Sequence, residues 1–133
     1  MRGPTEARKV LIVDDNADFA EFVGEVAREC GLCEHILTDT TQFKEHCEQL
    51  RPEIVVLDIT MPGIGGLILA QWLGEYARRH QPDLRLVILS GCDEEIIQHC
   101  REVGANSGVI DIIALAKPVA YVVLAEALTL EAR

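Results

Sequence analysis

Short runs of apolar, largely β-branched residues alternate along the chain with segments whose apolar residues recur at helical spacing. The apolar runs predict buried strands at residues 9–13, 34–38, 54–57, 84–89 and 109–116, of which the second is weak. The helical spacing predicts helices at residues 18–30, 40–50, 65–80, 93–103 and 120–130. Gly31, Pro52 and Pro82 are expected to stop the helices that precede them, and residues 104–108 to form a loop.

Strands that alternate with helices favour parallel crossover connections, and continuous apolar strands favour a sheet covered on both faces. The pattern therefore predicts a doubly wound, five-stranded parallel sheet in a three-layer α/β/α sandwich. A length of 133 residues is that of one ordinary domain with a core of its own. We expect residues 9–131 to form this domain, after a polar leader at 1–8 and before a short stub at 132–133.

Polar or charged residues end or follow four of the predicted strands. They are Asp14 and Asp15 after the first, Asp58 after the third, Ser90 after the fourth and Lys117 after the fifth. The carboxyl ends of parallel strands lie at one edge of the sheet, which is where ligands bind in open α/β folds. We therefore expect these five residues to share one site.

Three carboxylates at such an edge repel one another, at a cost of roughly 4 kcal/mol for each pair at about 4 Å and an effective dielectric constant near 20. A cation must offset this repulsion. Oxygen donors without a histidine or thiolate favour Mg²⁺, and Lys117 adds a second positive charge. Beside them Asp58 can act as a carboxylate nucleophile toward a phosphoryl group, and Ser90 can donate a hydrogen bond to it.

The charge of the chain narrows the classes of partner. Twelve basic and 22 acidic residues give a formal net charge of −10, so we expect no direct nucleic-acid binding and no attraction to an anionic membrane. The apolar runs are too short to span a bilayer, and residues 1–9 are too polar for a signal peptide. The prediction is a cytoplasmic protein.

Other conspicuous residues are expected to be structural. Cys30 and Cys33 have C-x-x-C spacing, but Cys30 falls at the end of a predicted helix, where the helix dipole disfavours a thiolate. We expect reduced, incidental cysteines. Trp72 is expected to pack against the sheet, and Tyr121 to begin the last helix on a face that could contact a partner.

Five motifs occur in order along the chain: Val13-Asp14-Asp15-Asn16, Leu57-Asp58-Ile59-Thr60-Met61-Pro62-Gly63-Ile64-Gly65-Gly66, Leu89-Ser90-Gly91, Gly104-Ala105 and Ala116-Lys117-Pro118. Together they resemble the receiver domain of bacterial response regulators, over about the whole chain. The resemblance implies a flavodoxin-like fold with strand order 2-1-3-4-5. It also implies a signalling switch that takes a phosphoryl group from a histidine kinase and signals through the face formed by the fourth helix, fifth strand and fifth helix.

The resemblance assigns a role to each candidate residue. It makes Asp58 the phosphoacceptor and Asp14 and Asp15 the acidic pair that binds Mg²⁺, Asp15 directly and Asp14 through water. The backbone carbonyl of Thr60 corresponds to a third protein ligand of the metal. Ser90 corresponds to the switch hydroxyl. Lys117 corresponds to the family lysine, and the Pro118 that follows it is usually cis in the family.

The chain departs from the family pattern in three places. Gly65 replaces an aspartate of the loop after the phosphoacceptor, and Ala114 replaces an aromatic residue that couples to the switch hydroxyl. Lys117 lies thirteen positions after Gly104, about twice the usual separation, so the fourth helix or its loop is expected to be enlarged.

Several functional alternatives stay open. The leading hypothesis is a phosphorylation-operated switch without a separate substrate, which is modified by a kinase, a phosphotransfer protein or a small phosphodonor. A degenerate receiver would act only as a dimerisation or scaffold module, and a small Mg²⁺-dependent phosphohydrolase would use Asp58 on a metabolite. A flavin-binding flavodoxin is less favoured, because the loop after the first strand is acidic and does not have the hydroxyl and glycine residues that bind a phosphate. The output is expected to be an unidentified protein, a fused effector domain or a homodimer.

Overall fold

The computed structural model describes residues 8–58, 66–91, 94–108 and 111–129. Its strands are β1 (Lys9–Val13), β2 (Cys33–Leu37), β3 (Ile54–Asp58), β4 (Arg85–Ser90) and β5 (Asp111–Ala116). Its α-helices are α1 (Ala17–Glu29), α2 (Phe43–Leu50), α3 (Gly66–His80), α4 (Glu94–Ser107) and α5 (Tyr121–Thr129), and a 3₁₀ turn, η1 (Thr40–Gln42), precedes α2.

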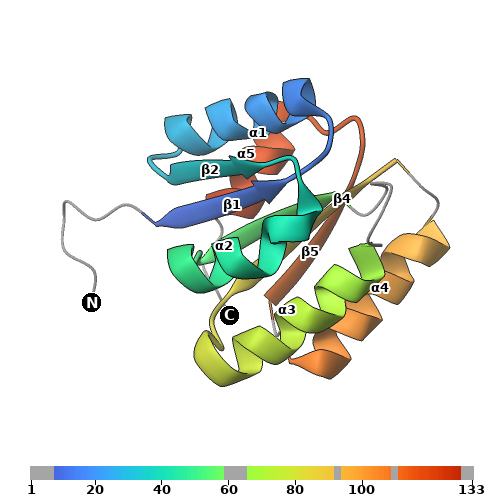
Figure 1. Ribbon diagram of the computed structural model, residues 1–133. Coiled ribbons are helices and arrows are strands. Elements are labelled where there is room, and N and C mark those ends of the chain that lie inside the picture. The colour runs from blue at the N-terminus through green and yellow to red at the C-terminus, as the bar shows by residue number, and fades with distance from the viewer. Residues whose placement is uncertain (1–7, 59–65, 92–93, 109–110, 130–133) are drawn as a thin grey trace.

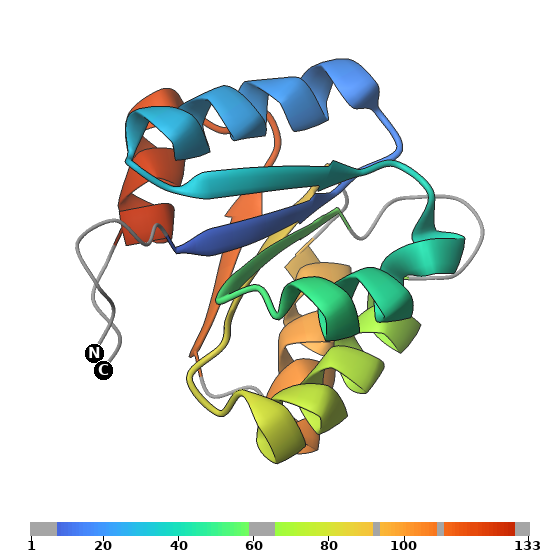
Figure 2. The ribbon, with the colours of Figure 1, turned by 60° about the vertical axis from the view of Figure 1, so that its left-hand side comes forward.

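The strands form one parallel sheet in the order β2-β1-β3-β4-β5. Helices α1 and α5 cover one face, and α2, α3 and α4 cover the other (Figure 1). Figure 2 shows the same three layers from a second direction. The predicted three-layer α/β/α sandwich and the strand order implied by the resemblance are both confirmed.

The position of each strand explains its sequence pattern. The central strands β3 and β4 are buried along their whole length, which explains why most of their side chains are apolar on both faces. Alternate residues enter two separate cores: Val55 and Leu57 pack toward α2 and α3, whereas Ile54 and Val56 pack toward α1 and α5. The edge strand β2 is mostly exposed, which is why its hydrophobic signal is weak.

Helix α4 occupies most of the segment between β4 and β5. Helix α4 continues through Gly104 to Ser107, so the expected loop at 104–108 is wrong. Gly108 ends the helix with a φ of 140°. A Cβ there would lie 2.4 Å from the backbone oxygen of Gly74 in α3, so only glycine allows α4 to approach α3 this closely.

Smaller differences occur at other helix ends. The helix expected at 40–50 is divided, because the Asp39 side chain accepts a hydrogen bond from the Thr41 amide and caps a 3₁₀ turn before α2 begins. Gly31 follows α1 with a φ of 80°, which confirms it as a stop. No helix within the described part of the chain is long and apolar enough to cross a membrane.

Candidate functional site

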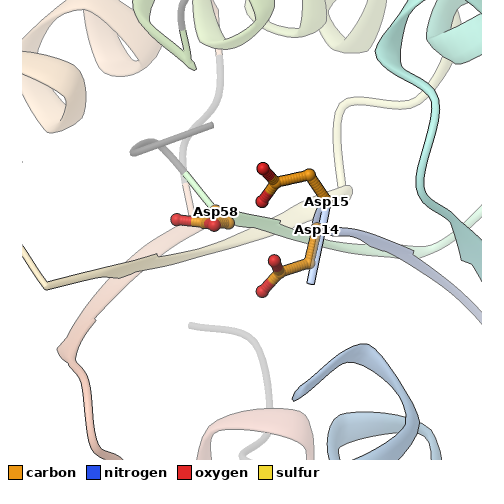
Figure 3. Close-up of side chains that lie close together, drawn as sticks. All are labelled: Asp14, Asp15 and Asp58. Carbon is orange, nitrogen blue, oxygen red and sulfur yellow. The ribbon is translucent and has the colours of Figure 1, made fainter. Parts of the chain in front are cut away.

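The carboxyl edge of the sheet gathers the residues that the sequence singled out. Asp14 and Asp15 follow β1, Asp58 is the last residue of β3, Ser90 is the last residue of β4, and Lys117 follows β5. Strands β1 and β3 are neighbours although β2 comes between them in the chain, so the winding of the sheet reverses at this point. Figure 3 shows the three carboxylates gathered where these two strands end.

The carboxylates form a donor set for a cation. One oxygen from each of Asp14, Asp15 and Asp58 lies within 4.8 Å of the others. Asp14 and Asp58 are 2% and 3% exposed, whereas Asp15 is open to solvent. Three carboxylates, one of them accessible, fit the preference of Mg²⁺ for oxygen ligands and for retained water.

Lys117 lies between two of these carboxylates. Its Nζ donates to Asp14 Oδ2 at 3.0 Å and lies 3.3 Å from Asp58 Oδ2. Its backbone N–H donates to the carbonyl oxygen of Ser90, which fixes the chain beside the end of β4. The Lys117–Pro118 peptide bond is cis, as the resemblance implied.

Burial raises the pKa of Asp14 above its usual value, and the negative charge of Asp58 acts in the same direction. Hydrogen bonds from the Asn16 amide and from Lys117 oppose this shift. The carboxylate is therefore costly to keep ionised, and positive charge nearby offsets the cost. This is the electrostatic need that a bound cation would meet.

The structure brings four of the six predicted site residues into direct proximity: Asp14, Asp15, Asp58 and Lys117. Ser90 is fully buried at the same edge. Thr60, whose carbonyl was assigned to the metal, lies outside the described residues. Ala114 is half-buried in β5, beside Ile88 of β4, so an alanine occupies the position of the family aromatic.

Sequence reasoning missed one neighbour of the site, Phe19. It belongs to the helix predicted at residues 18–30 from apolar spacing, which indicates burial alone, but its ring lies under the Lys117 ammonium, with Nζ 4.2 Å from the ring centroid. The signal was its place in the first turn of the helix that follows the acidic pair. That turn begins at the carboxyl edge and therefore borders the site.

Other singled-out residues lie away from the site. Tyr121 donates its hydroxyl hydrogen bond to Glu29 of α1, so its side chain is directed to the α1 side of α5. Trp72 of α3 is half-buried against the core and stacks on Tyr76 of the same helix. Cys30 is half-buried and Cys33 is exposed, and neither is near the acidic cluster.

The comparison with protein families matches this arrangement to a known domain. A model of the response regulator receiver domain matches residues 10–129. The chain belongs to this family. Receiver domains are signalling switches of two-component systems and not enzymes in the usual sense, and the acidic pocket of the family binds Mg²⁺.

Individual relatives agree with this assignment. The DNA-binding response regulator MtrA of Mycobacterium bovis is 30% identical over 103 residues, which are 71% of this chain and 45% of that protein. This receiver chain thus spans less than half the length of that relative.

Solved structures support the fold. The chemotaxis protein CheY4 of Vibrio cholerae has a TM-score of 0.77 at 19% identity, over 92% of this chain and 97% of that one. A Burkholderia pseudomallei response regulator, solved with a phosphorylated aspartic acid and a calcium ion, has a TM-score of 0.73 at 20% identity, over 92% of this chain and 67% of that one.

Proposed function

We propose that this receiver is a phosphorylation-operated switch that accepts a phosphoryl group on Asp58 with the help of Mg²⁺. The observation that carries the proposal is the bridge of Lys117 between Asp14 and Asp58, at the edge where Ser90 also ends its strand. A carboxylate nucleophile, an ammonium group and a hydroxyl donor are thereby grouped at one place. The donor would be a histidine kinase, a phosphotransfer protein or a small acyl phosphate.

The chemistry follows from these positions. A carboxylate oxygen of Asp58 attacks the phosphorus of the donor and forms a new P–O bond. The bond between phosphorus and the leaving group breaks, and the leaving group takes the electron pair. Lys117, whose Nζ is 3.3 Å from Asp58 Oδ2, would stabilise the negative charge on the phosphoryl oxygens. Asp14, Asp15, Asp58 and the carbonyl of Thr60 would hold Mg²⁺, which supplies further stabilisation of that charge. Water later attacks phosphorus, and Asp58 leaves as a carboxylate.

The added group would operate the switch through charge. A phosphoryl group adds about −1.5 to −2 charges, together with strong acceptor oxygens, which would draw the Ser90 hydroxyl and the Lys117 ammonium inward. Ser90 ends the strand that precedes α4, and Lys117 follows β5. Movements of these two residues would therefore reach the face formed by α4, β5 and α5. With alanine at position 114, the movement must pass through the backbone and α4, and not through a rotating aromatic ring.

The same face is the proposed site for an output partner. Strand β5 is only half-buried along its length, and Val122 and Val123 on α5 are 70% and 44% exposed. The partner would be another protein, an effector region beyond this chain, or a second receiver. The phosphorylated aspartic acid of the Burkholderia pseudomallei relative supports the chemistry, and the DNA-binding role in the name of MtrA makes a fused output region a reasonable candidate.

The proposal is tested by the intact mass of the protein after incubation with acetyl phosphate and Mg²⁺. We expect one phosphoryl increment that is lost with EDTA and in Asp58→Asn. No increment in a protein shown separately to bind Mg²⁺ would favour a scaffold receiver. An increment that persists in Asp58→Asn would mean that another residue is the nucleophile, and turnover of a metabolite phosphate would favour a phosphohydrolase.

A further inference from the structure

Among the described residues, one aromatic ring lies against the site lysine. Lys117 has four rotatable side-chain bonds, and its side chain is 21% exposed, so the ammonium could also turn toward solvent. The carboxylates of Asp14 and Asp58 hold it from one direction. The face of the Phe19 ring, 4.2 Å from Nζ, borders it from another, well inside the range of a cation–π contact.

The first turn of α1 fixes this ring relative to the acidic cluster. Asp14 Oδ1 accepts a hydrogen bond from the Asn16 amide at 2.9 Å, while Asp14 Oδ2 accepts from Lys117. The Asn16 side chain in turn caps the helix by accepting from the Phe19 amide at 3.1 Å. One short stretch of backbone therefore carries the Asp14 carboxylate, the Asn16 cap and the Phe19 ring. The Lys117 ammonium contacts both the carboxylate and the ring.

We infer that Phe19 is a positioning residue for phosphoryl transfer, which acts by keeping the Lys117 ammonium next to Asp58. The inference rests on the proposed role of Asp58 as phosphoacceptor. Nζ is already 3.3 Å from Asp58. To reach a phosphoryl group there, it needs only to exchange its contact with Asp14 for one with a phosphoryl oxygen. The ring limits the alternative movement into solvent and so keeps the charge where the transition state needs it.

Phe22 offers a matched control. It lies one turn further along α1, with its ring centroid 5.8 Å from that of Phe19, and both rings are half-buried against the same core. Phe19→Leu and Phe22→Leu thus remove similar packing, but only the first removes the ring face next to Lys117. Phe19→Tyr keeps that face.

The first measurement is the rate of phosphorylation by acetyl phosphate, followed by intact mass over a range of donor concentrations. We expect Phe19→Leu to lower the maximal rate constant about three- to tenfold, with a smaller change in the half-saturating donor concentration. Phe19→Tyr and Phe22→Leu should stay within about twofold of wild type. A purely structural role would slow both leucine variants alike, and that result, or a Phe19→Leu variant at wild-type rate, would overturn the inference.

The second measurement does not depend on phosphorylation. Protons held over an aromatic face are shifted upfield, so NMR of the Lys117 ε-methylene group should show this shift in wild type and Phe19→Tyr but not in Phe19→Leu. Absence of the shift in wild type would overturn the placement of the ammonium over the ring. A wild-type protein that shows the shift but takes up no phosphoryl group would instead refute the proposed function, and with it any role of Phe19 in the transfer.

Discussion

Arg85 is a charged side chain within the hydrophobic core, and its acidic partner allows a quantitative test of how β4, β5 and α5 are held together. The side chain is 1% exposed; its Nε donates to Asp111 Oδ2 at 2.8 Å and its guanidinium donates to the Ala127 carbonyl at 2.9 Å. Asp111 is opposite Arg85 on the neighbouring strand, and its side chain is 23% exposed. The two partners therefore differ in their access to water.

This difference predicts unequal costs for removing each partner. Asp111→Ala leaves a buried guanidinium without its carboxylate, which costs about 3 kcal/mol of unfolding free energy, the lower end for a buried pair because Asp111 is partly solvated. Arg85→Met fills a similar volume and leaves Asp111 able to reach water. It loses the hydrogen bond to the Ala127 carbonyl, so it should lower the free energy of unfolding by about 1–2 kcal/mol. The double variant should cost about as much as Arg85→Met alone.

Urea unfolding followed by circular dichroism measures these free energies. With a slope of about 2 kcal/mol per molar, Asp111→Ala should lower the midpoint by about 1.5 M. Adding Arg85→Met to Asp111→Ala should raise the midpoint again by about 0.5–1 M. A double variant less stable than Asp111→Ala would refute the reasoning, because it would mean that the guanidinium stabilises the fold without its carboxylate.

Three further predictions concern other parts of the molecule. Mg²⁺ at one hundred times its Kd should stabilise the protein by about 2.7 kcal/mol in thermal unfolding, and Asp15→Asn, which removes the exposed carboxylate, should abolish most of this gain. Burial raises the pKa of the Cys47 thiol to about 12, so a thiol reagent at pH 8 should label Cys33 quickly in the native protein and Cys47 only after unfolding. Equal labelling rates of the two cysteines in the native protein, measured by peptide mass, would contradict the burial of Cys47. Gly108→Ala should lower the free energy of unfolding by about 2 kcal/mol or more, because its Cβ would overlap the Gly74 carbonyl, and unchanged stability would mean that α4 does not approach α3 so closely.

The sheet and the edge of the site could be predicted because each depends on a local pattern. Fully buried parallel strands require continuous apolar runs, and the first polar residue after such a run must lie at the carboxyl edge. Asp14, Asp58 and Lys117 were located in this way. Strand order followed only from the resemblance, since the pattern of one strand does not say which strand lies beside it.

The remaining features depend on contacts between distant segments. Gly104 and Gly108 are equally good helix stops by residue type, and only the packing of α4 on Gly74 of α3 selects the second. The ring of Phe19 under Lys117 likewise requires the packed fold, because β5 must bring the lysine to the first turn of α1. Helical spacing identifies a buried ring but does not tell which charge lies over it.

The central claim is that Asp58 accepts the phosphoryl group, and peptide mapping of the phosphorylated protein tests it most directly. After reaction with acetyl phosphate and Mg²⁺, the protein would be digested at acidic pH, where acyl phosphates survive, and the modified peptide sequenced by mass spectrometry. The account predicts the increment on Asp58. An increment on Asp14, Asp15 or any histidine, with Asp58 unmodified, would contradict it.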